Sequence, residues 1–244
     1  MARSIQTVED VLRLLDAMFP EDADRWTDRG ASWWDRFYGK RDAGVPFFRP
    51  LPDESLVAWH HDGTLRVTDG ARALDLGCGP GRNAIWLAEQ GYQVDAVDLS
   101  PEALDWARER AAQRGVEVNL VRANIFDWQA PHPAYDLVYD SGCFHHLPPH
   151  RRISYRTLLE RTLAPGGAFG LGCFAAGAMG STDPDEALYR AGKLSGGLAY
   201  TDGELRDSFG WMTEVDVRRM RQMPPDSDLF GESFLWAGLF RRSA

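Results

Sequence analysis

The stretch Ala73-Leu74-Asp75-Leu76-Gly77-Cys78-Gly79-Pro80-Gly81 decides the fold of this chain. An apolar run ends at an acidic residue and three glycines in alternate positions, and residues 83–88 then resume at helical spacing. The pattern predicts a strand, a tight turn and a helix. Glycines in the turn allow a sharp bend and leave room for a ligand where a Cβ would collide. A nucleotide-type cofactor is the expected occupant.

Strand and helix signals alternate from residue 71 onward, which is typical of a mainly parallel sheet with helices on both faces. The pattern predicts strands at residues 71–76, 92–97, 116–121, 135–140, 168–174, 212–217 and 234–240. It predicts helices after the first two strands, at residues 150–163, and from a capping box at Thr201 to Gly210. Residues 175–200 are rich in glycine and are expected to cover the site as a loop or lid with a short helix.

Asp98 ends the second strand, and Ser100 and Pro101 then open the next helix. The carboxyl ends of strands in an open α/β sheet form the crevice where ligands bind. A carboxylate at that place can accept hydrogen bonds from both hydroxyls of a ribose. The alternative is that Asp98 only caps a helix or lies on the surface.

The spacing of the glycines separates two classes of cofactor. A dinucleotide fingerprint requires a glycine at its sixth position, which is Arg82 here. The turn instead resembles motif I of the class I, Rossmann-like S-adenosylmethionine-dependent methyltransferases. In that family an Asp-x-Gly-x-Gly-x-Gly turn passes under the methionine and ribose portions of the cofactor. A purely structural turn is the alternative interpretation.

The resemblance covers roughly residues 72–240, because four motifs occur in order at the expected strand ends. It implies an α/β fold: a three-layer, seven-stranded, mostly parallel sheet with an antiparallel last strand, helices on both faces and an N-terminal helical lid. The implied domains are a lid segment at residues 1–60 and a methyltransferase domain at 61–244, with a lid insertion around 175–200. The implied cofactor residues are Asp75, Gly77, Cys78, Gly79, Gly81, Asn83, Asp98, Leu99, Asn124, Ile125, Asp140, Ser141, Trp33 and Phe37.

Two of these assignments have open alternatives. After the third strand, Asn124 is expected to meet the exocyclic amine of adenine and Ile125 to pack on the ring, as in methyltransferases of this type, but Asn124 also suits a simple turn. Trp33 and Phe37 belong to an aromatic cluster at residues 32–38 that forms either ordinary core or a lid over a ligand. Before this cluster, Thr7 is expected to cap a helix that Pro20 stops.

A narrower similarity points to the thiopurine and small-thiol S-methyltransferase branch, whose N-terminal aromatic residues close over the cofactor. The motifs that carry it are Trp33-Trp34-Asp35-Arg36-Phe37, Val45-Pro46-Phe47, Ile125-Phe126-Asp127 and Tyr135-Asp136-Leu137-Val138-Tyr139-Asp140. That branch often has an arginine directly after the aspartate of strand four. Here this residue is Ser141, which leaves the acceptor open.

Methyl transfer from a sulfonium centre requires mainly alignment and exclusion of water. A base is needed only if the nucleophile arrives protonated. His145 and His146 follow the fourth strand and are the candidate catalytic bases, with His145 favoured. The alternative is that one of them caps the following helix. Asp140 is expected to position the segment. No metal is expected, since the adjacent His60 and His61 do not share a helix face.

Composition limits the partners. A net charge of -9 and a pI near 5.1 give nucleic acid no broad electrostatic reason to bind. We expect a cytoplasmic monomer or homodimer without a signal peptide or membrane span, with reduced cysteines, acting on a small, partly apolar acceptor at sulfur or oxygen. Two alternatives are a non-catalytic S-adenosylmethionine-binding module and a nicotinamide-dependent oxidoreductase.

Overall fold

The computed structural model describes residues 5–132 and 134–244, so residues 1–4 of the predicted N-terminal segment lie outside it. Seven strands form one sheet in the order β3-β2-β1-β4-β5-β7-β6. The strands are β1 (Arg72–Leu76), β2 (Gln93–Asp98), β3 (Asn119–Arg122), β4 (Tyr135–Ser141), β5 (Leu163–Phe174), β6 (Thr213–Arg219) and β7 (Leu235–Arg241). β7 runs antiparallel to both of its neighbours, and the other neighbouring pairs are parallel. The predicted fold class is confirmed.

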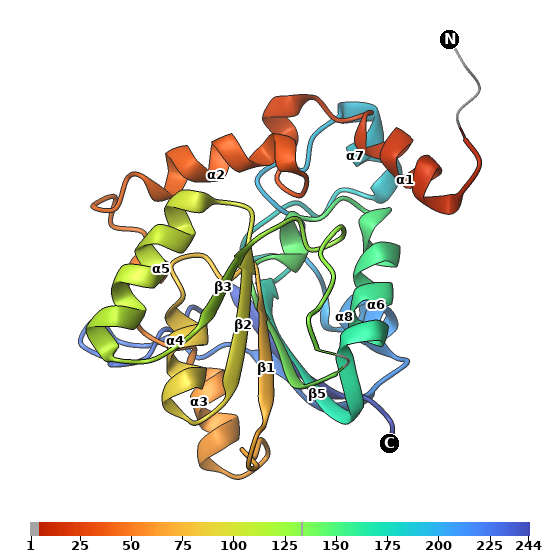
Figure 1. Cartoon of the computed structure of the whole chain (residues 1–244). Coiled ribbons are helices and arrows are strands. Elements are labelled where there is room, and N and C mark those ends of the chain that lie inside the picture. The colour runs from red at the N-terminus through yellow and green to blue at the C-terminus, as the bar shows by residue number, and fades with distance from the viewer. Residues whose placement is uncertain (1–4, 133) are drawn as a thin grey trace.

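Helices cover both faces of the sheet (Figure 1). α3 (Glu54–His61), α4 (Arg82–Glu89) and α5 (Pro101–Arg114) pack on one face, and α6 (Arg151–Thr162) and α8 (Asp202–Phe209) pack on the other. Alternate residues of β1 divide between the two cores, with Ala73 facing α3 and α4 and Leu74 facing α6. Both faces of the sheet are therefore buried, which explains why the sequences of the central strands are nearly continuous apolar runs.

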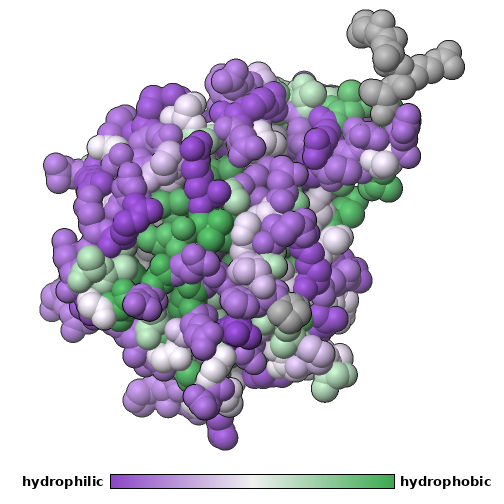
Figure 2. All heavy atoms as spheres, viewed as in Figure 1, coloured by the Kyte–Doolittle hydropathy of each residue, from purple (hydrophilic) through white to green (hydrophobic). Residues whose placement is uncertain are grey.

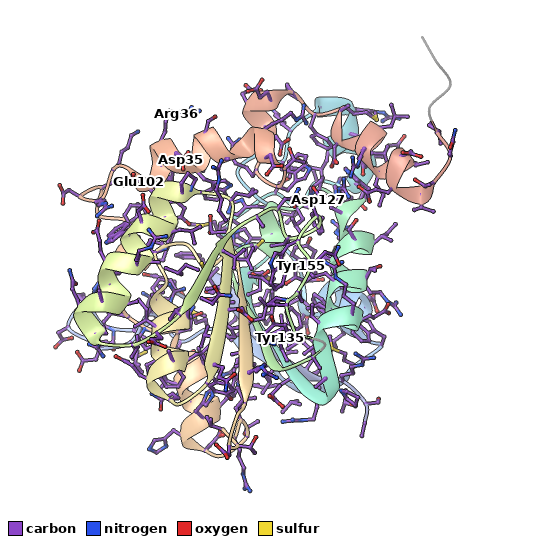
Figure 3. All side chains as sticks on the ribbon, in the orientation of Figure 1. Asp35, Arg36, Glu102, Asp127, Tyr135 and Tyr155 are labelled. Atoms are coloured by element: carbon purple, nitrogen blue, oxygen red, sulfur yellow. The ribbon has the colours of Figure 1, made fainter. Side chains whose placement is uncertain are left out.

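The N-terminal segment crosses the sheet above the carboxyl ends of the strands, where α1 (Val8–Asp16), α2 (Ala31–Tyr38) and α7 (Asp185–Ala191) lie together (Figure 1). α2 is fastened to α5, because the Ser100 hydroxyl donates to Asp35 at 2.6 Å and Arg41 pairs with Glu102 at 3.1 Å. Figure 3 labels Asp35 and Glu102 where the two helices meet. The predicted helix caps at Thr7, Ser100 and Thr201 are confirmed.

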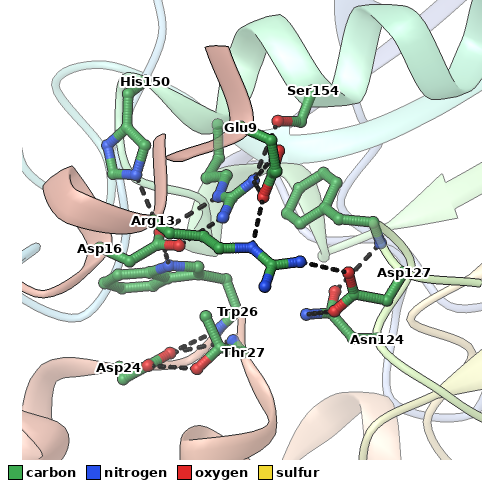
Figure 4. A network of polar contacts seen from close by, with 12 residues as sticks. Glu9, Arg13, Asp16, Asp24, Trp26, Thr27, Asn124, Asp127, His150 and Ser154 are labelled. Carbon is green, nitrogen blue, oxygen red and sulfur yellow. Dashed lines mark hydrogen bonds and ion pairs between the residues drawn. The ribbon is translucent and has the colours of Figure 1, made fainter. Parts of the chain in front are cut away.

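A buried ionic cluster fastens α1 to α6 (Figure 4). Asp16 accepts hydrogen bonds from the indole of Trp26 at 2.7 Å, from His150 Nε2 at 2.8 Å and from Arg151 Nε at 3.1 Å. These donors hold the pKa of Asp16 well below its usual value despite burial. Tyr189 of α7 bonds the other ring nitrogen of His150 at 2.7 Å. Asp16 and His150 thus link the N-terminal segment, α6 and α7.

Helix α3 was not among the predicted elements. It follows Pro50 and Pro52, and its buried residues are Glu54, Ser55, Leu56 and Trp59, the last two in the core under the sheet. Because two of these four buried residues are polar, the helix carries no clear apolar stripe, and its period is hard to see in the sequence. The predicted domain boundary at residues 60 and 61 falls at the end of this helix, and that division stays a prediction.

The visible surface in Figure 2 is mostly hydrophilic, with one cluster of hydrophobic side chains beside α5 at the β3 edge of the sheet. Among the described residues, no helix has the length and apolar character that crossing a membrane requires. The predicted cytoplasmic location and oligomeric state stay predictions.

Candidate functional site

A cavity of about 450 Å³ lies at the carboxyl ends of the strands, under the N-terminal segment. It is within the usual size range of small-molecule sites. Twelve of the predicted site residues line it: Trp33, Phe37, Gly77, Cys78, Gly79, Asp98, Leu99, Asn124, Ile125, Ser141, His145 and His146. The other four, Asp75, Gly81, Asn83 and Asp140, do not line it. These residues lie far apart in the sequence. The sheet and the N-terminal segment above it bring them together.

The glycine turn after β1 is closed tightly against its surroundings. Gly77 has φ +64° and a Cβ there would lie 2.7 Å from Cβ of Cys143; Gly79 has φ +51° and a Cβ there would lie 2.9 Å from the Tyr38 hydroxyl. Both conformations favour glycine, and neither place has room for a side chain. A Cβ on Gly81 would instead collide with Ala107 of α5, so this third glycine serves the packing of two helices.

Asp98 lies beside this turn, as predicted. One of its carboxylate oxygens accepts from the backbone N–H of Gly79 and the other from that of Ser100, both at 2.8 Å. Burial raises the pKa of Asp98 to about 6, although these hydrogen bonds favour the ionised form. The remaining lone pairs of a fixed carboxylate on the cavity wall suit the two hydroxyls of a ribose.

Asn124 forms the turn of the alternative interpretation and also faces the cavity. Its side-chain oxygen accepts from the backbone N–H of Phe126 at 3.0 Å, which is the turn of the alternative interpretation, and its amide contacts Asp127 at 3.4 Å (Figure 4). It also lines the cavity together with Ile125. The contact with adenine stays a prediction.

Two of the predicted residues outside the cavity, Asn83 and Asp75, lie behind the glycine turn. Asn83 accepts from the backbone N–H of Asp53 at 2.9 Å, and Asp53 pairs with the guanidinium of Arg82. Asp75 is buried below the turn, where burial raises its pKa to about 8. Asn83 and Asp75 therefore support the glycine turn from the side away from the cavity.

Asp140 fixes the segment that carries the two histidines. Its carboxylate accepts from the backbone N–H groups of Gly142, Cys143 and Phe144 at 2.8–3.0 Å and from the Tyr155 hydroxyl at 2.6 Å. Figure 3 labels Tyr155 on α6. Burial raises the pKa of Asp140 to about 7. These contacts agree with the positional role that the sequence predicts for Asp140.

A layer of rings forms one wall of the cavity. Trp33 meets Trp34 edge-on with 4.8 Å between ring centroids, and Trp34 meets His146 in the same way at 5.0 Å. His146 lies 4.4 Å from His145, which stacks on Phe174 at 3.7 Å. The layer therefore runs from the N-terminal segment to the end of β5, and its rings offer a large apolar surface to a flat molecule.

Burial strongly disfavours the charged form of both histidines. It lowers the pKa of His146 to about 3, with the nearby Arg25 contributing, and it holds the pKa of His145 well below the usual value. Both imidazoles are neutral at physiological pH. Whether either acts as a base stays a prediction.

Several lining residues were not among the predicted site residues: Arg25, Trp34, Tyr38, Arg82, Cys143, Phe174, Phe230 and Phe234. Trp34 and Tyr38 belong to the aromatic cluster at residues 32–38, so a helical projection of that cluster offered a signal. Phe230 and Phe234 lie in the connection between β6 and β7, where no local pattern indicates that the chain returns to the site. In the sequence, Arg82 is informative only because it stands where the dinucleotide fingerprint requires a glycine.

Comparison with known proteins agrees with this geometry. Residues 73–167 match the methyltransferase domain family. The matched stretch contains the glycine turn, Asp98 and the segment after β4. This central stretch is therefore similar to a methyltransferase domain, and it lies within a seven-stranded sheet of the Rossmann-like kind.

Individual relatives extend this likeness. A cypemycin N-terminal methyltransferase from Streptomyces sp is 34% identical over 176 residues, which are 70% of this chain and 64% of that protein. A 2-heptyl-1-hydroxyquinolin-4(1H)-one methyltransferase from Mycobacteroides abscessus is 34% identical over 94 residues, which are 38% of this chain and 41% of that protein. The chain thus spans less than two thirds of the length of either relative.

One solved structure is similar over nearly its whole length. It is described as the conversion of a disulfide bond into a thioacetal group during echinomycin biosynthesis, and it aligns with a TM-score of 0.66 and 26% identity over 87% of this chain and 92% of that chain. None of these three proteins is described as a thiopurine methyltransferase, and the narrower branch stays a prediction.

Proposed function

We propose that this protein transfers a methyl group from S-adenosylmethionine to a small, largely apolar acceptor, at oxygen or sulfur. The observation that carries the proposal is the cavity itself: one chamber joins a side-chain-free turn, a fixed carboxylate on the neighbouring strand and a wall of aromatic rings. A nicotinamide cofactor is disfavoured because Arg82 opens α4 where the dinucleotide fingerprint needs a glycine.

The residues of the cavity divide into two groups. Gly77, Gly79, Asp98, Leu99 and Ile125 suit the adenosyl part of the cofactor, since they surround the turn and the end of β2. The acceptor would meet the residues at the opposite side, which are His145, His146, Phe174, Met179, Phe230 and Phe234. S-adenosylmethionine supplies an activated methyl group, so the protein's task is to hold the acceptor in line and keep water out.

The test is a panel of phenols, N-hydroxy heteroaromatics, thiols and amines, each incubated with the protein and S-adenosylmethionine. Mass spectrometry reads the methylated product, and a coupled assay reads S-adenosylhomocysteine. A Gly77→Ala variant serves as the control, because a side chain there fills the turn. Tight cofactor binding without S-adenosylhomocysteine formation across the panel would favour the non-catalytic module instead.

The preference for oxygen or sulfur over an amine nitrogen rests on the ring layer that forms one wall of the cavity. A peptide N-terminus, the acceptor implied by the name of the Streptomyces relative, is a strongly hydrated amine that an aromatic chamber serves poorly. We therefore favour a flat aromatic acceptor. Preferred methylation of peptide amines in the panel would contradict this choice.

A further inference from the structure

His145 is held in one orientation. It lies in the 3₁₀ turn Phe144–His146 and is 4% exposed. One face of the imidazole stacks on Phe174 with an interplanar angle of 15°. A Cβ placed on Gly197 would come within 3.2 Å of its Cδ2, and its carbonyl accepts from the backbone N–H of Leu198 at 2.7 Å. The ring therefore cannot turn freely to exchange the places of its two nitrogens.

The two ring nitrogens differ in their surroundings. Nδ1 is buried and has no hydrogen-bond partner among the described residues. Nε2 is not enclosed in this way, and the side chain lines the cavity. Nε2 is thus the nitrogen available to a molecule in the chamber.

This difference fixes the tautomer. A neutral imidazole carries one proton. A proton on Nδ1 would leave a buried N–H without an acceptor, and such orphaned N–H groups are rarer in proteins than acceptors that lack a donor. The proton therefore belongs on Nε2, where it points toward the cavity.

The same environment opposes a general base at this place. To act as a base, His145 would accept a proton from the acceptor at Nε2 while its own proton stays on Nδ1, and the resulting imidazolium would bury a charged, unpartnered Nδ1–H. Among the described residues, the titratable groups that line the cavity with this ring are Arg25, Tyr38, Cys78, Arg82, Asp98, Cys143 and His146. Asp98, the carboxylate among them, already accepts from the backbone N–H groups of Gly79 and Ser100, and Asp140 lies at the start of the same segment. Arg25 is a cation, and Asp140 already accepts four hydrogen bonds. None of these groups is placed to compensate the charge.

The chamber also contains a cation at its N-terminal side. The guanidinium of Arg25 stacks on Trp33 with its Cζ 3.9 Å from the ring centroid. It donates to the carbonyl of Asp24 at 2.7 Å and forms no ion pair with a carboxylate of the described residues. The lining therefore presents donors and positive charge to the acceptor, and Asp98, which binds the backbone at the turn, is the one carboxylate among the described lining residues.

We propose that His145 donates a hydrogen bond from Nε2–H to the acceptor, and that the site methylates nucleophiles that arrive already ionised. The acceptor class is then an acidic phenol, an N-hydroxy heteroaromatic or a heteroaromatic thiol. This inference rests on the proposed methyl transfer. In the reaction, a lone pair of the anion forms the new bond to the methyl carbon, the sulfonium keeps the electron pair of the broken C–S bond, and both partners become neutral without a proton transfer.

The first test is independent of catalysis. In protein labelled with ¹⁵N-histidine, long-range ¹⁵N–¹H correlation identifies which ring nitrogen carries the proton, and His145→Gln and His132→Gln variants assign the signals. The expected result is His145 with Nε2–H, unchanged between about pH 5 and 8. A proton on Nδ1, or titration to the doubly protonated ring within this range, would overturn the assignment.

The second test uses 4-nitrophenol, whose ionised form has its own absorbance band, with the protein loaded with S-adenosylhomocysteine. The bound probe should ionise about one pH unit lower than the free probe, a tenfold preference for the anion. His145→Gln keeps an N–H donor and should retain most of this shift, whereas His145→Phe should lose it. Binding of the neutral phenol, no saturable binding, or equal loss in both variants would refute the proposal.

Catalysis supplies the third readout. For para-substituted phenols and thiophenols that are methylated, the pH midpoint of kcat/KM should follow the ionisation of each acceptor. One fixed midpoint for every acceptor would show that a base of the enzyme titrates instead. Failure of the proposed function is distinguishable, because it would appear as no S-adenosylhomocysteine formation while the tautomer and the 4-nitrophenol shift remain measurable.

Discussion

Replacing Asp98 by asparagine tests the assignment of the cofactor site most directly. Each carboxylate oxygen of Asp98 already accepts one backbone N–H, from Gly79 and from Ser100. Asparagine keeps the size of the side chain but has one acceptor oxygen in place of two. The variant therefore offers a ribose one acceptor fewer, and it brings an NH₂ group toward a backbone donor.

The magnitude follows from the hydrogen bond that is lost. A hydrogen bond to a charged group is worth about 1.5–3 kcal/mol, which corresponds to about a 10- to 150-fold rise in Kd. The backbone N–H left without its acceptor lowers the free energy of unfolding by about 1–3 kcal/mol as well. We expect the affinity for S-adenosylhomocysteine to fall at least tenfold at pH 7.5 while the protein remains folded.

Isothermal titration calorimetry with S-adenosylhomocysteine measures this loss, and a pH series sharpens it. Burial raises the pKa of Asp98 to about 6, so the carboxylate is ionised above that pH and gains a proton below it. The wild-type affinity should fall as the pH drops through about 6, approaching a tenfold loss per pH unit. Asp98→Asn carries no titrating group there and should lose this dependence.

Asp95 provides the matched control. It lies on the same strand, is 4% exposed and accepts from the Tyr135 hydroxyl at 2.6 Å, but it does not line the cavity. Asp95→Asn should change stability with little effect on Kd. If Asp98→Asn binds S-adenosylhomocysteine as tightly as the wild type, or if both variants lose affinity equally, the assignment of Asp98 to the ribose is wrong.

Three further predictions concern the frame of the site. Gly77→Ala should abolish cofactor binding by calorimetry, whereas Gly115→Ala, with a similar φ of +68° but nothing within 4 Å of its Cβ, should cost only the backbone strain of about 1–2 kcal/mol; equal losses would show that the collision is unimportant. Asp16→Ala removes the buried carboxylate from Arg151 and leaves its guanidinium with the part-exposed Glu9 as its remaining carboxylate partner, so it should lower the free energy of unfolding in urea by about 3–5 kcal/mol, and a change below 1 kcal/mol would contradict the buried cluster. Burial raises the folded-state pKa of Asp75 to about 8, above the unfolded value of about 3.9, so the wild type should lose stability as pH rises through that interval. Asp75→Asn should flatten this loss, and parallel stability curves for the two proteins would argue against it.

The sheet was predictable because its information is local. Each buried strand is a short apolar run, and α5 and α8 begin at the side-chain caps Ser100 and Thr201, so the elements and their order follow from neighbouring residues. The ends of the strands were harder to predict from the sequence. β3 begins at Asn119, three residues later than predicted, because its position at the sheet edge leaves it half-buried and weakly patterned. Helix α3 was not predicted because two of its four buried residues, Glu54 and Ser55, are polar, which leaves no clear apolar stripe to reveal a helix.

The site was predictable only where its residues follow strands. Asp98, Asn124 and Ser141 stand at strand ends, and a parallel sheet brings strand ends to one edge. Phe174 stands at the end of a predicted strand, but its stacking on His145 depends on the three-dimensional fold and cannot be read from that strand. Tautomers and charge states depend on burial in three dimensions, which is why the sequence suggested a histidine base and the structure suggests a donor.

Ser141 follows Asp140 at the end of β4, and a positive charge lies beside it although the residue itself is neutral. The thiol-methylating branch often has an arginine there, and this chain has Ser141. The guanidinium of Arg82, which is only 8% exposed, donates to the Ser141 hydroxyl at 2.7 Å and pairs with Asp53 behind it. Arg82 also lies over the ring of Phe230, at the acceptor side of the cavity. A positive charge therefore reaches the end of β4 from α4, the helix that follows β1, so the departure at Ser141 does not count against an acidic or thiol acceptor.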